Sequence, residues 1–168
     1  MRNLSNPIKY GIETKQIKLQ VEYKGVFLIA LRILLVLLAK MTIKNNEIIA
    51  EGNNQVTANN DPCGHAEIVA IRNACKKLND FFLKGCDLYT SCEPCPMCLS
   101  AIYWSHVDNI YYANTRIDAK DIDFDDSFIY SEVKKDINDR KIKMIQMNRD
   151  EALEAFKIWQ TKEDKIKY

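Results

Sequence analysis

The sequence predicts an α/β layered domain, because short segments with strand character alternate with longer segments of helical periodicity. Its 168 residues, of which 47% are hydrophobic, are enough to close one core. No stretch rich in Gly, Ser or Pro offers a linker between domains. We therefore expect one domain that spans residues 1–168.

The first elements of this pattern are a hairpin and a helix. Thr42 to Lys44 and Glu47 to Glu51 flank the turn-forming pair Asn45-Asn46, which predicts a β-hairpin. Asp61-Pro62-Cys63-Gly64 then breaks the chain. Apolar residues at helical spacing follow and predict a helix from His65 to Leu78.

The second half of the chain continues the alternation. Cys86 to Ser91 has the character of a strand, and Pro96 to His106 that of a helix. Asn109 to Ala113 and Lys141 to Met147 are two further predicted strands. A charged amphipathic helix is expected from Glu151 to Lys165.

An apolar segment from Val26 to Ala39 precedes the hairpin. It is shorter than the roughly twenty residues that span a bilayer, and it contains Arg32. No small-residue cleavage site follows it, as a signal peptide would require. We expect a buried helix or strand here and no contact with a membrane.

Two short motifs carry the chemistry of the chain. His65-Ala66-Glu67 and Pro94-Cys95-Pro96-Met97-Cys98 supply one imidazole, two thiolates and a carboxylate. The side chains of His65, Cys95 and Cys98 can fill three corners of a zinc tetrahedron and leave the fourth for water. His-x-Glu followed by Pro-Cys-x-x-Cys is the signature of nucleobase deaminases, in which the glutamate moves protons.

Two other interpretations of the cysteine pair are a redox site and half of a structural zinc knuckle. A structural site needs a fourth Cys or His ligand, and the other histidine of the chain is His106. Cys92 is not expected to be a ligand, because Cys95 and Cys98 already have the required spacing.

Both motifs lie at predicted helix starts, where His65 and Glu67 can lean toward one ion. Pro96 suits a first helical position, and the positive end of the helix dipole favours thiolates.

The charge and cysteine content limit the partners and the compartment. The 24 basic and 23 acidic residues give a formal net charge of +1, which does not favour binding to nucleic acid and suits a small neutral substrate. The metal-type spacing of the cysteines predicts a reducing cytoplasm. Cys63, Cys75 and Cys86 are expected to be ordinary free thiols.

Three segments carry a resemblance to a known family: CGHAEIVAIRNACKK (63–77), YTSCEPCPMCLSAIYW (89–104) and FDDSFIY (124–130). They resemble the bacterial guanine deaminases of the cytidine deaminase-like superfamily, from about Glu47 to Tyr168. The resemblance implies a three-layer α/β/α fold, with a central five-stranded mixed sheet and helices on both faces. It also implies one Zn²⁺ per subunit, a homodimer, and hydrolysis of guanine to xanthine and ammonia.

The resemblance also implies residue roles. Glu67 would be the catalytic acid and base, and Asn54 and Asp126 would bind the purine. Trp104 would wall the purine ring, and Tyr168 would reach the partner's pocket because the C-terminal segment, 149–168, is exchanged between subunits. Without the resemblance, Asn54 would be a turn residue, Asp126 a helix-capping or solvated carboxylate, Trp104 a core residue and Tyr168 a frayed end.

One segment departs from the family. The positions that align with a Gly-Gly-Pro-Phe-Gly-type stretch are Leu35 to Ala39, which contain no glycine, proline or aromatic residue. One hypothesis is a compensated frameshift in the gene. Two alternatives to guanine deaminase stay open: a tRNA-specific adenosine deaminase, which shares the zinc motifs, and a catalytically silent zinc-binding fold caused by the altered segment 26–39.

Overall fold

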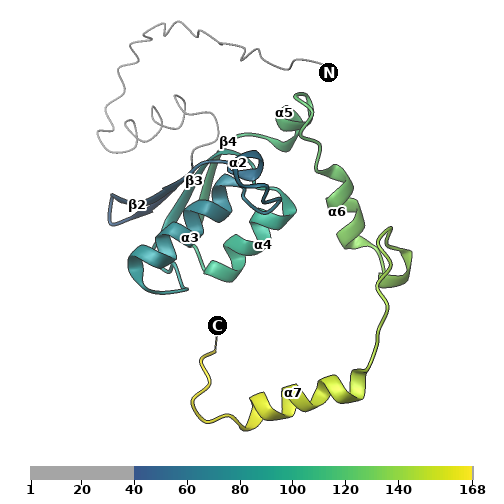
Figure 1. Ribbon diagram of the computed structural model, residues 1–168. Helices are drawn as coiled ribbons and strands as arrows, with labels where there is room; N and C mark the ends of the chain where they lie inside the picture. The colour runs from purple at the N-terminus through teal and green to yellow at the C-terminus, as the bar shows by residue number, and fades with distance from the viewer. Residues whose placement is uncertain (1–39, 168) are drawn as a thin grey trace, which may run out of the picture.

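The computed structural model of the chain describes residues 40–167 (Figure 1). The predictions for the apolar segment 26–39 and for Tyr168 lie outside these residues. None of the described helices is long and apolar enough to cross a membrane.

A four-stranded mixed sheet forms the centre of the fold (Figure 1). The strands are β1 (Lys40–Lys44), β2 (Glu47–Gly52), β3 (Asp87–Cys92) and β4 (Asn109–Asn114), in the order β2-β1-β3-β4. β1 pairs antiparallel with β2 and with β3, whereas β3 and β4 are parallel. The predicted α/β class and the mixed sheet are therefore confirmed.

The strand predicted from Lys141 to Met147 is wrong for this chain, and the described sheet has four strands where five were expected. This segment is irregular, and Ile142 and Ile145 are 80% and 81% exposed. A strand is stable only beside a partner strand, and the described residues place none next to this segment.

The hairpin of β1 and β2 forms as the sequence predicts. Asn45 and Asn46 both have positive φ values, 51° and 63°. Two successive positive φ values are the requirement of a type I′ turn, which matches the twist of the flanking strands, and asparagine tolerates this conformation well.

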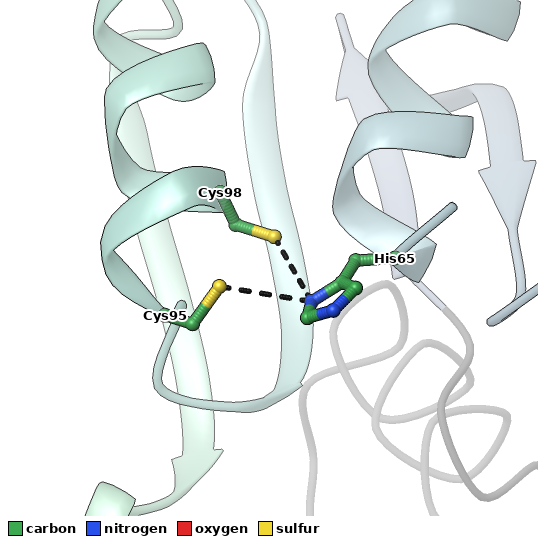
Figure 2. Close-up of side chains that lie close together, drawn as sticks. All are labelled: His65, Cys95 and Cys98. Atoms are coloured by element: carbon green, nitrogen blue, oxygen red, sulfur yellow. Dashed lines mark hydrogen bonds between the residues drawn. The ribbon is translucent and has the colours of Figure 1, made fainter. Parts of the chain in front are cut away.

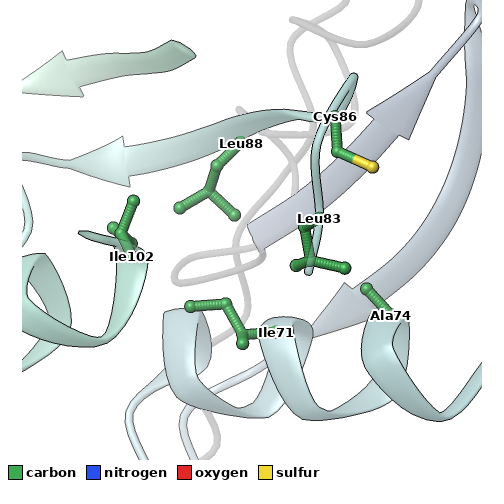
Figure 3. Close-up of a cluster of buried hydrophobic side chains, with 6 residues drawn as sticks. All are labelled: Ile71, Ala74, Leu83, Cys86, Leu88 and Ile102. Carbon is green, nitrogen blue, oxygen red and sulfur yellow. The ribbon is translucent and has the colours of Figure 1, made fainter. Parts of the chain in front are cut away.

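Two helices, α3 (Ala66–Leu78) and α4 (Pro96–Ser105), lie side by side on one face of the sheet (Figure 1). Side chains from both helices and from β3 form the core between the layers, as Figure 3 shows for Ile71, Leu88 and Ile102. Leu88 and Thr90 of β3 face this core, while the intervening Tyr89 stacks on Tyr111 of β4 at 4.6 Å between ring centroids. This alternation follows from the period of two along a strand.

Shorter helices complete the described chain: α2 (Val56–Asn59), α5 (Arg116–Lys120), α6 (Ser127–Lys134) and the 3₁₀-helix η1 (Ile137–Asp139). The predicted C-terminal helix is present as α7 (Arg149–Thr161). In Figure 1, α7 lies apart from the sheet and from α3 and α4. The positions of α3 and α4 are what bring the two sequence motifs together.

Candidate metal centre

The two predicted metal motifs meet at the starts of α3 and α4 (Figure 2). His65 and Cys95 are the N-cap residues of these helices, both with extended backbone, and Pro96 occupies the first turn of α4. His65 Nδ1 lies 3.6 Å from Cys95 Sγ and 3.5 Å from Cys98 Sγ. The ligand atoms of His65, Cys95 and Cys98 all lie within 4.8 Å of one another.

This spacing fits a zinc ion. Zinc binds thiolate sulfur at about 2.3 Å and imidazole nitrogen at about 2.0 Å, and tetrahedral angles then place nitrogen and sulfur about 3.5 Å apart. The two observed nitrogen–sulfur distances, 3.6 and 3.5 Å, agree with this value. The three side chains can therefore hold zinc as three of its four ligands.

The pKa values of the two cysteines are shifted in opposite directions. The hydrogen bond from the Cys98 thiol, followed by backbone N–H groups of Cys98 and Met97, lowers the pKa of Cys95 to about 6. The same sharing of a proton, together with burial and the nearby Glu67, raises the pKa of Cys98. Both cysteines would bind zinc as thiolates, so binding of the metal would release their thiol protons.

Glu67 lies beside the three ligands but is not one of them. It stands in the first turn of α3, its residue is only 6% exposed, and its Oε2 accepts a hydrogen bond from Cys98 Sγ at 3.4 Å. A carboxylate placed here can exchange protons with a molecule held at the fourth corner of the metal, as the sequence predicts.

Gly52, at the end of β2, lies unusually close to α3. A Cβ atom at this position would stand 2.4 Å from the carbonyl oxygen of Ala66 and 2.5 Å from the backbone nitrogen of Ala70. Only glycine fits between the strand and the helix. The strand end that leads to Asn54 therefore lies directly on the helix that carries Glu67.

Asn54, a predicted substrate residue, is oriented by a local hydrogen bond. Its Oδ1 accepts from the backbone N–H of Val56 at 3.0 Å, and the backbone N–H of Gln55 donates to the carbonyl of Gly64 at 2.8 Å. The second bond ties this loop to the residue before His65. This hydrogen bond orients the side-chain amide of Asn54 through its oxygen, and the amide nitrogen carries two donors.

Asp126, the second predicted substrate residue, is the N-cap residue of α6, but its side chain does not cap the helix. Burial raises the pKa of this carboxyl above its ordinary value. The alternative interpretation of Asp126 as a helix-capping residue is therefore wrong, since the neighbouring Asp125 accepts the backbone N–H of Ser127 instead.

The other predicted residues lie elsewhere. Trp104 is in the last turn of α4, at the opposite end of that helix from Cys95, and is 66% exposed. Its role, like that of Tyr168, stays a prediction. Cys92 Sγ points to the carbonyl of Thr115 at 3.6 Å, away from the metal ligands.

The remaining cysteines are free thiols, as expected: Cys63 is exposed, Cys75 is partly buried and Cys86 is buried. Burial raises the pKa of both Cys75 and Cys86, which keeps these thiols protonated.

Two residues near the centre, Arg116 and Tyr130, were not predicted from the sequence, and both contact the loop that carries Cys95. Tyr130 lies on α6, a helix that was not predicted either. The apolar spacing of Phe128, Ile129 and Val133 after Asp125-Asp126-Ser127 is the signal that could have found it.

Comparisons with known proteins agree with this geometry. Residues 37–114 match the family described as the cytidine and deoxycytidylate deaminase zinc-binding region. The chain is 49% identical over 126 residues to a guanine deaminase of Bacillus subtilis (strain 168), covering 75% of this chain and 81% of that protein.

The X-ray structure of guanine deaminase from Bacillus subtilis superposes with a TM-score of 0.75 at 48% identity, over 77% of this chain and 83% of that one. A tRNA-specific adenosine deaminase of Aquifex aeolicus (strain VF5) is 41% identical over 71 residues, which cover 42% of this chain and 47% of that protein. The similarity to the guanine deaminase covers 75% of the chain, whereas the similarity to the tRNA-specific adenosine deaminase covers 42% of it.

Proposed function

Because the chain belongs to the family of bacterial guanine deaminases, which share the cytidine and deoxycytidylate deaminase zinc-binding region, we propose that it hydrolyses guanine to xanthine and ammonia. The observation that carries this function is the convergence of His65, Cys95 and Cys98 next to the buried Glu67. The 49% identity to a guanine deaminase gives the substrate.

The residues divide the work. When bound by the three ligands, zinc would lower the pKa of a water molecule toward neutrality. Glu67 takes a proton from the attacking water so that its oxygen adds to carbon 2 of the purine, and Glu67 then delivers protons to the ring nitrogen and to the departing amine. The thiol-to-carboxylate contact of Cys98 and Glu67, at 3.4 Å, supports this role because it places the acid at the edge of the metal site.

Substrate recognition is assigned to Asn54, Asp126, Trp104 and Tyr168. The N–H donors of Asn54 suit the acceptor atoms of the purine, and the carboxylate of Asp126 suits the N–H groups of guanine, an edge that adenine does not present. The fixed direction of Asn54 and the partial burial of Asp126 support these two assignments.

The functional unit is proposed to be a homodimer in which one domain, residues 1–168, exchanges its C-terminal segment, 149–168, with the partner. This proposal is supported by exposed apolar side chains along the C-terminal third of the chain: Ile137, Ile142, Met144, Ile145, Met147, Phe156, Ile158, Trp159 and Ile166. Such a series is unusual on the surface of a monomer.

The assembled protein is also where the full three-layer fold is expected. β4 is at the edge of the described sheet, and its outer side can accept a fifth strand. Helices on the second face of the sheet stay part of this proposal.

Ammonia release tests the function. Zinc-loaded protein is incubated separately with guanine, adenine, cytosine and a tRNA anticodon stem-loop that contains adenosine. Release from guanine alone is expected. Release from the stem-loop alone would favour the tRNA-specific adenosine deaminase, the second candidate, for which the 41% identity over 71 residues is the supporting observation.

Retention of zinc without release from any substrate would instead favour the silent fold attributed to the segment 26–39. Sequencing the gene beside those of close relatives tests the frameshift, because a frame without compensating insertions or deletions would exclude it.

A further inference from the structure

Four residues connect α5 and α6 to the loop between β3 and α4: Glu93, Pro94, Arg116 and Tyr130, here called the α6 latch. The hydroxyl of Tyr130 donates to the carbonyl oxygen of Pro94 at 3.3 Å, and Pro94 is buried. The guanidinium of Arg116 lies 5.1 Å from the centroid of the Tyr130 ring. The backbone N–H of Arg116 donates to Glu93 Oε2 at 3.1 Å.

The loop that the α6 latch contacts is held in place by the sheet. The backbone N–H of Glu93 donates to the carbonyl of Asn114 at 2.8 Å, which extends the pairing of β3 and β4 beyond Cys92. Pro94 directly precedes the zinc ligand Cys95. Tyr130 therefore contacts backbone whose position is set both by the sheet and by the metal ligand.

Asp126 lies on the same side of α6 as Tyr130. The backbone N–H of Tyr130 donates to the carbonyl of Asp126 at 3.3 Å, and residues four apart share one face of a helix. Both residues, with Arg116, line an open hollow of about 520 Å³ between α5 and α6. The hydrogen bond of Tyr130 to the Pro94 carbonyl therefore lies one helical turn from Asp126.

From this arrangement we propose that Tyr130 is a positioning residue, whose hydroxyl holds Asp126 at the correct distance from the zinc ligands for substrate binding. The proposal rests on guanine deaminase as the function of the site. In this proposal Tyr130 does not bind the substrate itself, because its hydroxyl donates to the Pro94 carbonyl. Its effect on substrate binding passes through Asp126.

The test is Tyr130→Phe in the zinc-loaded full chain. This variant keeps the ring and its contact with Arg116 and removes only the hydroxyl. The zinc content should be unchanged, KM for guanine should rise by about three- to tenfold, and kcat should change by less than about twofold, as expected for the loss of one hydrogen bond that orients a binding group. Tyr103→Phe is the matched control, because Tyr103 is 74% exposed in the last turns of α4, and its KM should equal that of the wild type.

A double-mutant cycle with Asp126→Asn identifies the path of the effect. If Tyr130 acts through Asp126, then Tyr130→Phe should raise KM no further in the Asp126→Asn background. If the increases in KM from the two substitutions multiply in the double mutant, the proposal is overturned. A loss of zinc from Tyr130→Phe would also overturn it, because the hydroxyl would then stabilise the loop that carries Cys95.

If the parent enzyme is active and Tyr130→Phe has wild-type kinetics, the role of Tyr130 is refuted while the proposed function stands. An inactive, zinc-loaded parent would refute the proposed function and this inference with it.

Discussion

Replacement of Gly52 by alanine is predicted to damage the fold and the site together. The added Cβ would meet backbone atoms of α3 at 2.4 and 2.5 Å, whereas ordinary contacts begin near 3.4 Å. Backbone cannot rotate away as a flexible side chain can, so β2 and α3 must separate by about 1 Å, a form of overpacking.

The magnitude follows from this displacement. Overpacking of a well-packed site costs typically about 1–3 kcal/mol, and with a slope of about 2 kcal/mol per molar urea the midpoint of unfolding should fall by about 0.5–1.5 M. α3 begins at the N-cap residue His65 and carries Glu67. A misplacement of about 1 Å in such a site can lower turnover by about a hundredfold.

The assay compares urea unfolding and guanine turnover of zinc-loaded Gly52→Ala with those of Gly85→Ala. Gly85 has a φ of +76°, and among the described residues a Cβ there would meet the side chain of Lys44 alone, at 3.7 Å. Its replacement should cost about 1–2 kcal/mol from left-handed strain and leave turnover unchanged. A Gly52→Ala protein with the urea midpoint and turnover of the wild type would refute the reasoning.

Three further predictions concern the metal site and the surface. Glu67→Gln should keep its zinc and lose about 10²- to 10⁴-fold in turnover, and a rate near that of the parent would remove Glu67 from the proton transfers. Removal of zinc by a chelator should abolish turnover and lower the melting temperature, and added zinc should restore both; full activity of metal-free protein would contradict the proposed chemistry. Hydrogen bonds from Thr115 lower the pKa of Asp118, so the stability that this pair contributes is present above the ordinary carboxyl pKa and is lost as the pH falls through the lowered one. The melting temperature of Thr115→Val should therefore fall further below that of the wild type at neutral pH than in acid, where only the loss of the cap hydrogen bond from Asp118 N–H to Thr115 Oγ1 remains, and a difference that does not change with pH would refute this linkage.

Local signals explain which elements could be predicted from the sequence. The hairpin depends on Asn45-Asn46, which adopt the positive φ values that its turn requires. The helices after His65 and Cys95 have clear starts, with Pro96 in the first turn of α4. The spacing of Cys95 and Cys98 is also a local signal. The approach of the two helix starts is not local, but the combination of the two motifs implied it.

The elements that could not be predicted depend on distant contacts. Lys141 to Met147 has the residues of a strand, but whether it pairs depends on a neighbouring surface that the segment itself does not specify. The contact of Tyr130 with Pro94 joins residues 36 apart and has no sequence pattern. The close approach of Gly52 to α3 also could not be predicted from the sequence, since a glycine at a strand end is more often a simple turn residue.

The exposed apolar side chains of the C-terminal third affect how the protein behaves at low enzyme concentration. Under the proposed exchange, residues such as Ile145 and Phe156 are covered only when two chains meet, so dilution removes a source of stability. The melting temperature and the specific activity should then both depend on the protein concentration. Kinetic constants measured in the nanomolar range would describe a mixture of paired and separated chains, and only a titration of enzyme concentration would tell them apart.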